Sequence, residues 1–158
     1  MKKLIVYFTY TGNTEKIAKV IQKKLNCDIL KLNPLKPYST DYQTVVDEEQ
    51  NNESSKKTIP LEEYDTDLSI YDEIIIGSPV WWYSIAPVIR TFLKENDFSG
   101  KTIKPFATNA GWLGRTFKEI EELCPNSKIA QEMNIVFKSY SDELVTSQEE
   151  IDNWLKTL

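Results

Sequence analysis

Histidine is absent from the 158 residues of this chain, and cysteine occurs only twice. The lack of histidine excludes Ser-His-Asp and Cys-His catalysis, and it excludes any metal site built on imidazole ligands. Cys27 and Cys124 lie far apart in the sequence, without Cys-x-x-Cys spacing, so neither a disulfide framework nor a zinc cluster is expected. These absences predict a protein of the reducing cytoplasm that holds no metal.

Long apolar runs are missing as well. Lys2 and Lys3 precede an apolar stretch at 4–8, which is too short for a signal sequence or a membrane span. We therefore expect a strand there and no association with a membrane. The length of the chain predicts a single domain over residues 1–158.

Positive charge is the scarcer sign, with 19 Lys and Arg against 24 Asp and Glu, so the net charge is −5. This balance disfavours a nucleic-acid partner. The negative charge is concentrated in residues 41–73, which hold eleven acidic side chains against Lys56 and Lys57. Two interpretations remain open, a solvated helix and loop or an acidic docking rim for a basic partner.

What the sequence does contain is an alternation of apolar strands with helical segments. Strands are predicted at 2–8, 27–32, 73–76, 102–107 and within 128–137. Helices are predicted at about 14–25, 41–56, 86–95 and 115–123, and a capping box at 147–150 predicts one more. We expect Gly77-Ser78-Pro79 to end the third strand. The alternation predicts an α/β fold, with a doubly wound parallel sheet of five strands between two helix layers.

Three unusual loops, 9–14, 78–84 and 108–114, would leave the carboxyl edge of this sheet, where doubly wound folds bind ligands. The first, Thr9-Tyr10-Thr11-Gly12-Asn13-Thr14, joins a strand to a helix start and carries hydroxyl, amide and glycine residues without Lys or Arg. Helix-start amides and neutral side-chain donors suit one phosphate group, whereas a nucleoside triphosphate loop would need a lysine. An ordinary capped turn is the alternative. The Glu15 carboxylate near the helix start would repel a phosphate, but it can point to solvent, where it favours the helix dipole.

The other two loops suit a planar ring. The second, Pro79-Val80-Trp81-Trp82-Tyr83-Ser84, places three large aromatic residues where turn residues are usual, either as a lid packed on itself or as cover for a flat ligand. The third, Thr108-Asn109-Ala110-Gly111-Trp112-Leu113-Gly114, allows the backbone to approach a ring closely, unless it is a flexible helix lead-in. One phosphate and one planar ring together indicate flavin mononucleotide (FMN), with Trp82 expected to stack on the ring.

These motifs resemble the short-chain bacterial members of the flavodoxin family. The resemblance is carried by residues 9–14, 77–82, 86–93 and 108–114. It implies the sheet order 2-1-3-4-5 and noncovalent FMN binding. It assigns the phosphate to Thr9, Thr11, Gly12, Asn13 and Thr14, the ring faces to Pro79, Trp81, Trp82 and Tyr83, and the pyrimidine edge to Thr108, Asn109, Gly111 and Gly114. Tyr10, Val80 and Ala110 complete the candidate cofactor-binding residues.

Two departures from the family pattern are visible. No glycine lies between Ser78 and Gly100, although many flavodoxins have one beside the flavin, where a peptide changes its orientation. Ala110 also precedes Gly111 where relatives often carry a second glycine.

The resemblance implies a flavoprotein that transfers electrons at low potential between redox partner proteins, a reductase and an acceptor, as a monomer or weak dimer. The flavin carries the redox chemistry, so no catalytic acid or base is expected. The alternative is an oxidoreductase, an NAD(P)H-dependent FMN quinone or nitro reductase, which the missing glycine motivates. A receiver domain or a low-molecular-weight phosphatase on the same sheet is disfavoured, because the strand ends lack the carboxylates and the first loop lacks Cys and Arg.

Overall fold

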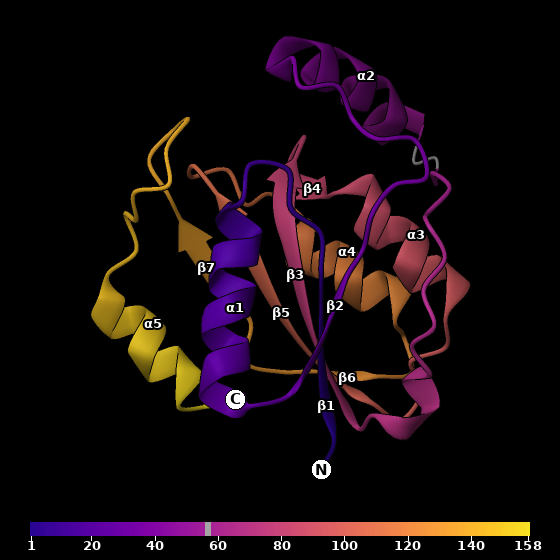
Figure 1. Ribbon diagram of the computed structural model, residues 1–158, viewed down its shortest axis with the longest axis vertical. Helices are drawn as coiled ribbons and strands as arrows, with labels where there is room; N and C mark the ends of the chain where they lie inside the picture. Colours follow the sequence, from indigo (N-terminus) through magenta and orange to yellow (C-terminus); the bar gives the residue numbers. More distant parts are fainter. Residues whose placement is uncertain (56–57) are drawn as a thin grey trace.

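A parallel sheet forms the centre of the molecule (Figure 1) in the computed structural model, which describes residues 1–55 and 58–158. Its strands are β1 (Lys3–Tyr7), β2 (Asp28–Lys31), β3 (Glu73–Trp81), β5 (Thr102–Asn109), β6 (Lys128–Ile129) and β7 (Met133–Val136). The strand order is β2-β1-β3-β5-β6, and β7 pairs with the carboxyl half of β5. The predicted 2-1-3-4-5 order is therefore confirmed, with the fifth strand divided into β6 and β7.

Four helices cover the two faces of the sheet. They are α1 (Asn13–Leu25) and α5 (Gln148–Leu155) on one face, and α3 (Pro87–Glu95) and α4 (Thr116–Leu123) on the other. The short elements are the 3-10 helix η1 (Leu68–Ile70) and the strand β4 (Ser84–Ile85). The predicted three-layer α/β architecture is confirmed.

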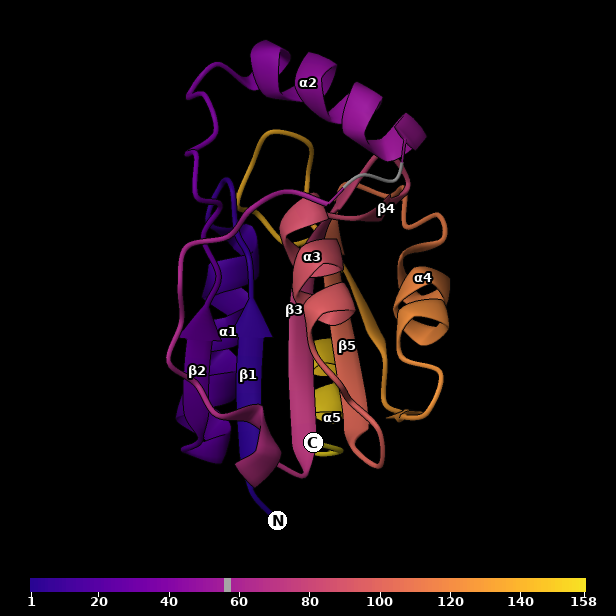
Figure 2. The same cartoon turned by 90° about the vertical axis from the view of Figure 1, so that its right-hand side faces the viewer.

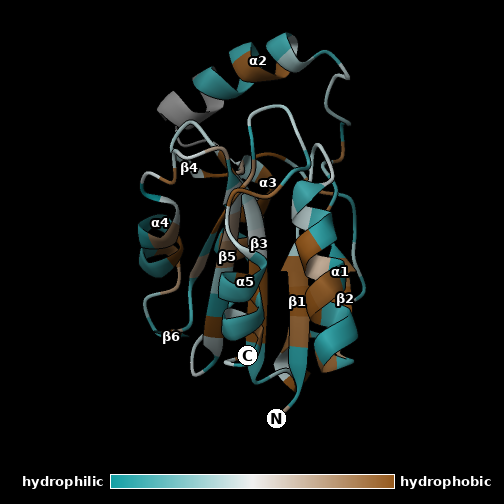
Figure 3. Cartoon of the chain, turned by 90° about the vertical axis from the view of Figure 1, so that its left-hand side faces the viewer, coloured by the Kyte–Doolittle hydropathy of each residue, from teal (hydrophilic) through white to brown (hydrophobic). Residues whose placement is uncertain are grey.

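Alternating side chains of β1 show how the sheet separates two apolar cores. Leu4 and Val6 pack with α3 and α4, whereas Ile5 and Tyr7 pack with α1 and α5. Successive side chains of a strand point to opposite faces, so a strand covered on both faces must be apolar throughout. In Figure 3 the hydrophobic colour accordingly follows β1 and the side of α1 next to it.

The helix α2 (Tyr42–Ser55) belongs to neither layer. Figure 2 shows it beyond the carboxyl ends of β1, β3 and β5, across the end of the sheet. The prediction placed this helix at about 41–56, and its last residue lies outside the described residues. Among the residues that the structure describes, none of the helices has the length and apolar character needed to cross a bilayer.

The prediction that Gly77-Ser78-Pro79 ends the third strand is wrong, because β3 continues through these residues to Trp81. Gly77 lies under the Phe106 ring of the neighbouring strand, and a Cβ on Gly77 would stand 2.2 Å from Phe106 Cζ. The carbonyl of Gly77 accepts a hydrogen bond from Phe8 N and so faces β1. Pro79 faces the same side, beyond the last β1 residue paired with β3, where the strand needs no donor.

Candidate functional site

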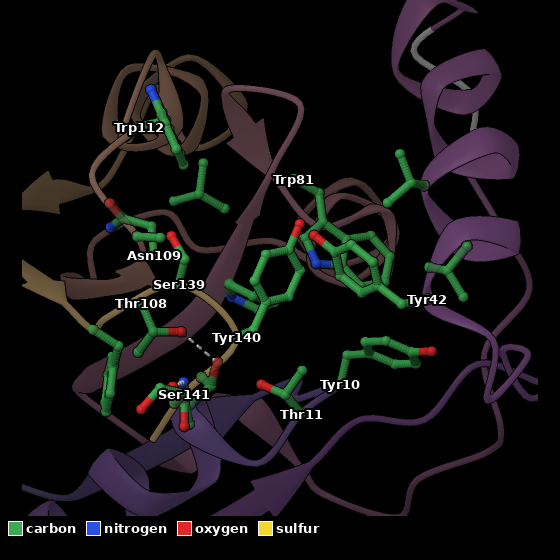
Figure 4. Close-up of a pocket in the computed structure, with 18 of the residues that line it drawn as sticks. Tyr10, Thr11, Tyr42, Trp81, Thr108, Asn109, Trp112, Ser139, Tyr140 and Ser141 are labelled. Carbon is green, nitrogen blue, oxygen red and sulfur yellow. Dashed lines mark hydrogen bonds between the residues drawn. The ribbon is translucent and has the colours of Figure 1, made fainter. Parts of the chain in front are cut away.

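A pocket of about 780 Å³ lies at the carboxyl edge of the sheet, beneath α2. All three predicted loops line it. Among the predicted site residues, those that line it are Tyr10, Thr11, Asn13, Thr14, Pro79, Val80, Trp81, Trp82, Tyr83, Thr108, Asn109 and Ala110, and the third loop adds Trp112, which was not assigned to the site. The predicted residues that do not line it are Thr9, Gly12, Gly111 and Gly114. Figure 4 shows how side chains from these separate segments turn toward one another.

The first turn leaves the amide groups at the start of α1 open. Gly12 is the N-cap residue with φ of 103°, and it has no side chain with which to cap the helix. The first N–H groups of a helix have no partner within it. The hydroxyl of Thr9 accepts a hydrogen bond from Gly12 N at 3.0 Å, and this bond stabilises the conformation of the turn. The turn therefore presents backbone donors and the positive end of a helix dipole to an anion.

Two side chains of the first turn connect it to other loops. The Asn13 amide donates to the carbonyl of Ser141 at 3.0 Å, and the hydroxyls of Thr14 and Thr108 lie 2.8 Å apart in a buried hydrogen bond. Thr14 is 1% exposed. These bonds fix the turn relative to the end of β5 and to the loop that follows β7.

The Glu15 side chain is held against the sheet and does not extend freely into solvent. Its carboxylate accepts a hydrogen bond from the Tyr7 hydroxyl at 2.9 Å and lies 3.7 Å from Lys31 Nζ. Burial, followed by the hydrogen bond to Glu15, raises the pKa of Tyr7. The carboxylate is thereby committed to partners on β1 and β2, and its charge is partly neutralised by Lys31.

The inner wall of the pocket is an edge-on aromatic cluster around Trp81. The ring centroid of Trp81 lies 5.5 Å from Phe8, 5.9 Å from Tyr10 and 5.1 Å from Tyr38. Such edge-to-face contacts stabilise a fixed ring orientation. Burial is also the main cause of a raised pKa at Tyr38, and the neighbouring Glu49 carboxylate adds to it. Trp81 is accordingly a rigid surface and not part of a loose lid.

The second loop is a tight hairpin. β4 pairs antiparallel with the end of β3, which leaves Trp82 and Tyr83 as a two-residue turn with φ of 51° and 63°. This is the type I′ geometry that asparagine and glycine normally supply, and each non-glycine residue there costs about 1 kcal/mol or more. Many flavodoxins have a glycine in this loop, whereas here Trp82 and Tyr83 themselves adopt the left-handed backbone conformation.

Neighbouring segments hold this strained hairpin in place. Arg115 N donates to the Tyr83 carbonyl at 2.8 Å, and a Cβ on Gly114 would stand only 2.2 Å from that oxygen. The Trp82 indole donates to the Val46 carbonyl of α2 at 3.2 Å. Gly114 thus supports the hairpin from outside the pocket.

Asn109 organises the third loop. Its side-chain oxygen accepts from Gly111 N at 2.9 Å, and its amide donates to Asn134 Oδ1 at 2.6 Å. Its main-chain carbonyl accepts from Phe137 N at 2.8 Å. The loop is therefore tied to β7 and is not a flexible lead-in to α4.

The structure adds two segments that the sequence analysis did not assign to the site. The α2 helix contributes Tyr42, Val45, Val46 and Glu49, and the loop after β7 contributes residues 137–142. The second of these could have been found, because the carboxyl end of a fifth parallel strand must reach the same edge. The α2 residues that line the pocket are spaced along one face of the helix, but the sequence does not indicate which part of the molecule this face would cover.

Charged groups are few around the pocket. Those among its lining residues are Glu49, Lys138 and Asp142, and Lys138 forms an ion pair with Glu143 at 2.8 Å. The open helix start with its hydroxyl and amide donors fits one phosphate, and the aromatic wall fits a flat heterocycle. The site therefore suits a mononucleotide with a planar ring better than a polyphosphate.

A doubly wound parallel sheet with a glycine-capped helix start and an aromatic pocket at its carboxyl edge is the arrangement of a flavodoxin-type α/β protein. The flavodoxin family model matches residues 2–158, and the chain belongs to that family. The resemblance inferred from the sequence motifs is thereby confirmed.

Several known proteins are similar to this chain. It is 31% identical to flavodoxin 1 of Escherichia coli over 106 residues, which are 65% of this chain and 46% of that protein. Flavodoxin of Klebsiella pneumoniae is 30% identical over 106 residues, again 65% of this chain and 46% of that protein. The chain thus matches about half the length of these curated relatives.

Solved structures share the fold along almost the whole chain. A Bacteroides uniformis protein superimposes with a TM-score of 0.79 and 28% identity, covering 98% of this chain and 97% of the other. A Lactobacillus acidophilus flavoprotein, solved in complex with FMN, gives a TM-score of 0.75 at 22% identity, with 97% of each chain covered. The second likeness establishes the fold.

Proposed function

We propose that this protein binds FMN and transfers electrons through it. The observation that carries the proposal is the glycine-capped, uncharged turn at 9–14, which opens into an aromatic pocket. Membership of the flavodoxin family and the FMN complex of the Lactobacillus flavoprotein support FMN as the cofactor. Bound FMN supplies the electron-transfer chemistry, and the side chains supply binding and environment.

The candidate residues divide this work between them. Thr11, Asn13 and Thr14 hold the phosphate through neutral donors, while Thr9 and Gly12, which do not line the pocket, shape the turn that carries them. Pro79, Val80, Trp81, Trp82 and Tyr83, with Tyr10, flank the ring and exclude water from it. Thr108, Asn109 and Ala110 meet the polar edge of the ring, while Gly111 and Gly114 shape the loop that carries them. Trp82 remains the residue proposed to stack on the ring.

A titration of the apoprotein with FMN tests this proposal. We expect one equivalent to bind, with quenching of flavin fluorescence by the adjacent aromatic rings and a shift of its visible absorbance. A folded apoprotein that leaves the FMN spectrum unchanged at micromolar concentrations would refute the proposed function.

Within this function we favour a low-potential electron carrier that works between redox partner proteins. An aromatic, water-poor environment disfavours the negative charge of a reduced flavin, which lowers its reduction potential. The exposed Asp47 and Glu48 on α2 belong to the acidic segment and lie on the helix that roofs the pocket, where a basic partner would approach. The protein is proposed to be a cytoplasmic monomer or weak dimer of one domain.

The second candidate, an NAD(P)H-dependent FMN quinone or nitro reductase, is favoured by one observation. The α2 helix lies over the pocket, so small molecules can reach a bound ring more easily than a protein surface can. Stopped-flow mixing of the FMN-loaded protein with NADPH alone separates the candidates. Rapid bleaching followed by turnover on a quinone indicates the reductase, and reduction only through a partner reductase indicates the carrier.

A further inference from the structure

Exposed aromatic side chains gather around the mouth of the pocket. In the described part of the chain, the aromatic residues that are largely exposed all line it: Tyr42, Trp82, Tyr83, Trp112 and Tyr140. Their exposure runs from 37% for Trp82 to 90% for Tyr140. Aromatic rings left in water around one opening are typical of a surface that binds a ligand.

These rings come from four separate segments. Tyr42 belongs to α2, Trp82 and Tyr83 form the hairpin turn, Trp112 follows β5, and Tyr140 follows β7. The rings of Tyr42 and Tyr140 meet edge-on at 5.4 Å, and Figure 4 shows Trp81, Trp112 and Tyr140 around the same space. Because the segments are far apart in the sequence, the cluster of exposed rings is formed by the tertiary fold and not by one hydrophobic loop.

The α2 helix forms a roof over this mouth that is apolar except for Glu49. Its lining residues, Tyr42, Val45, Val46 and Glu49, follow the spacing of one helix face. Asp47 and Glu48 are exposed on the helix, whereas Val45 is 3% exposed. The roof is joined to the hairpin by the bond from the Trp82 indole to Val46. A flat molecule in the mouth would therefore lie between an apolar helix face and aromatic rings.

The proposed flavin does not account for all of these rings. A flavin ring has two faces and can stack on two side chains, and the proposed function already gives it Trp82 and Tyr83 with the inner wall of Tyr10 and Trp81. The remaining exposed rings of the mouth are Tyr42, Trp112 and Tyr140, in a pocket whose volume, about 780 Å³, is in the upper part of the range for small-molecule sites. The mouth thus has surface for a second planar ligand.

The charges at the mouth decide what kind of ligand fits. The positively charged residue among the described lining residues is Lys138, which is paired with Glu143, while Glu49 and Asp142 are acidic. The pocket mouth has no uncommitted cation in this set to bind a second anionic group. The surroundings favour an uncharged ring over a dinucleotide or an aromatic acid.

We propose that the aromatic mouth binds a second ligand, an uncharged planar molecule of one or two fused rings, under α2 and next to bound FMN. This proposal rests on the proposed function, because it places the ligand beside the cofactor. It assigns Trp112 and Tyr140 to ligand recognition, and it gives α2 the role of a roof that the ligand packs against.

Equilibrium dialysis of the FMN-loaded protein tests the proposal with coumarin, an uncharged two-ring molecule, and with coumarin-3-carboxylate, its anionic counterpart. We expect one coumarin to bind per protein with a dissociation constant below about 1 mM, and the carboxylate to bind at least about ten times more weakly. Trp112→Ala and Tyr140→Ala should each weaken coumarin binding about five- to tenfold. The control is Leu35→Ala, an apolar residue outside the pocket that is about as exposed as Trp112, and it should leave coumarin binding unchanged.

The outcomes separate this proposal from the function on which it rests. If FMN binds but coumarin does not, or if both aromatic variants bind coumarin normally, the second site is refuted and the FMN proposal stands. Coumarin that binds only without FMN, or variants that lose FMN together with coumarin, would place these rings in the flavin site and also refute it. Failure of FMN itself to bind refutes both.

Discussion

Asn13 shows how one side chain can serve both the turn and its surroundings. Its amide nitrogen donates to the carbonyl of Ser141 at 3.0 Å, and its backbone N–H belongs to the open start of α1. The residue therefore joins the first loop to the loop after β7 without adding charge to the proposed phosphate site.

Replacing Asn13 by aspartate should weaken FMN binding by about 10- to 100-fold. The new carboxylate would face the phosphate, and at a few ångströms like charges repel by about 1–3 kcal/mol near a protein surface. Fluorescence titration measures the change. Asn13→Ala, which removes the Ser141 bond without adding charge, should lose much less affinity. Equal losses in the two variants would place the phosphate elsewhere.

Gly77 is required by a close approach between neighbouring strands. The Phe106 ring covers it so closely that a Cβ would stand 2.2 Å from Phe106 Cζ. Gly77→Ala should therefore lower the free energy of unfolding by about 1–3 kcal/mol or more, measured by urea denaturation. A second variant, Gly77→Ala with Phe106→Leu, should recover part of the loss relative to the Phe106→Leu protein. No recovery would mean that the ring is not the obstacle.

At the scale of elements, a buried ion pair joins α3 to α4. Arg90 Nη2 lies 2.8 Å from Glu119 Oε1, and the two side chains are 1% and 7% exposed. A second bond runs from Arg90 Nε to the same oxygen at 3.1 Å. Two helices on one face of the sheet are thereby fixed next to the hairpin, since Arg90 also donates to the Ile85 carbonyl at 3.4 Å.

Glu119→Gln should destabilise the fold by about 3–5 kcal/mol, because it leaves a guanidinium buried without its counter-charge. Urea denaturation followed by circular dichroism gives the value. The double variant Arg90→Met, Glu119→Leu removes both charges and should be far closer to the natural protein in stability. A Glu119→Gln protein as stable as the natural one would show that the pair is not needed.

The elements also show what the sequence could and could not predict. Four strands and the helices of both layers follow from local apolar spacing, because that pattern is set by burial on the sheet, and the start of α5 follows from its capping box at Ser147 and Glu150. The end of β3 was mispredicted, since Gly77 and Pro79 normally interrupt strands. Here the Phe106 ring occupies the space where a side chain at position 77 would lie, and Pro79 needs no donor because the pairing with β1 ends at Gly77. The break between β6 and β7 depends on pairing along β5, which local sequence does not encode.

The candidate site was predictable to a similar degree. Three loops were expected at one edge because parallel strands deliver their carboxyl ends together, and they do line one pocket. The roof formed by Tyr42, Val45 and Val46 could not be foreseen, because a helix outside both layers is positioned by long-range contacts such as the Trp82 bond to Val46.

For the molecule as a whole, alkaline pH should be destabilising. Burial raises the pKa of the Cys124 thiol from 9.0 to about 12, and burial with a hydrogen bond to Glu15 raises that of Tyr7. Below pH 9 these groups keep their protons in both states, so their contribution to stability is fully present. As pH rises, the unfolded chain releases the thiol proton first, and stability is lost until the folded thiol titrates as well.

We therefore expect the free energy of unfolding to fall by about 1 kcal/mol per pH unit between pH 9 and pH 11 on account of Cys124. Urea denaturation at several pH values measures the slope. Cys124→Ala, although less stable overall, should show a shallower slope than the natural chain. Identical slopes would contradict the link to the buried thiol.

The central claim is that an uncharged turn at the start of α1 binds the phosphate of FMN. The most direct test compares the affinity of the apoprotein for FMN with its affinity for riboflavin, which has the same ring and no phosphate. We predict that FMN binds at least about 100-fold more tightly, as several charge-assisted hydrogen bonds to the phosphate require. Equal affinity for the two flavins, or binding of neither, would contradict it.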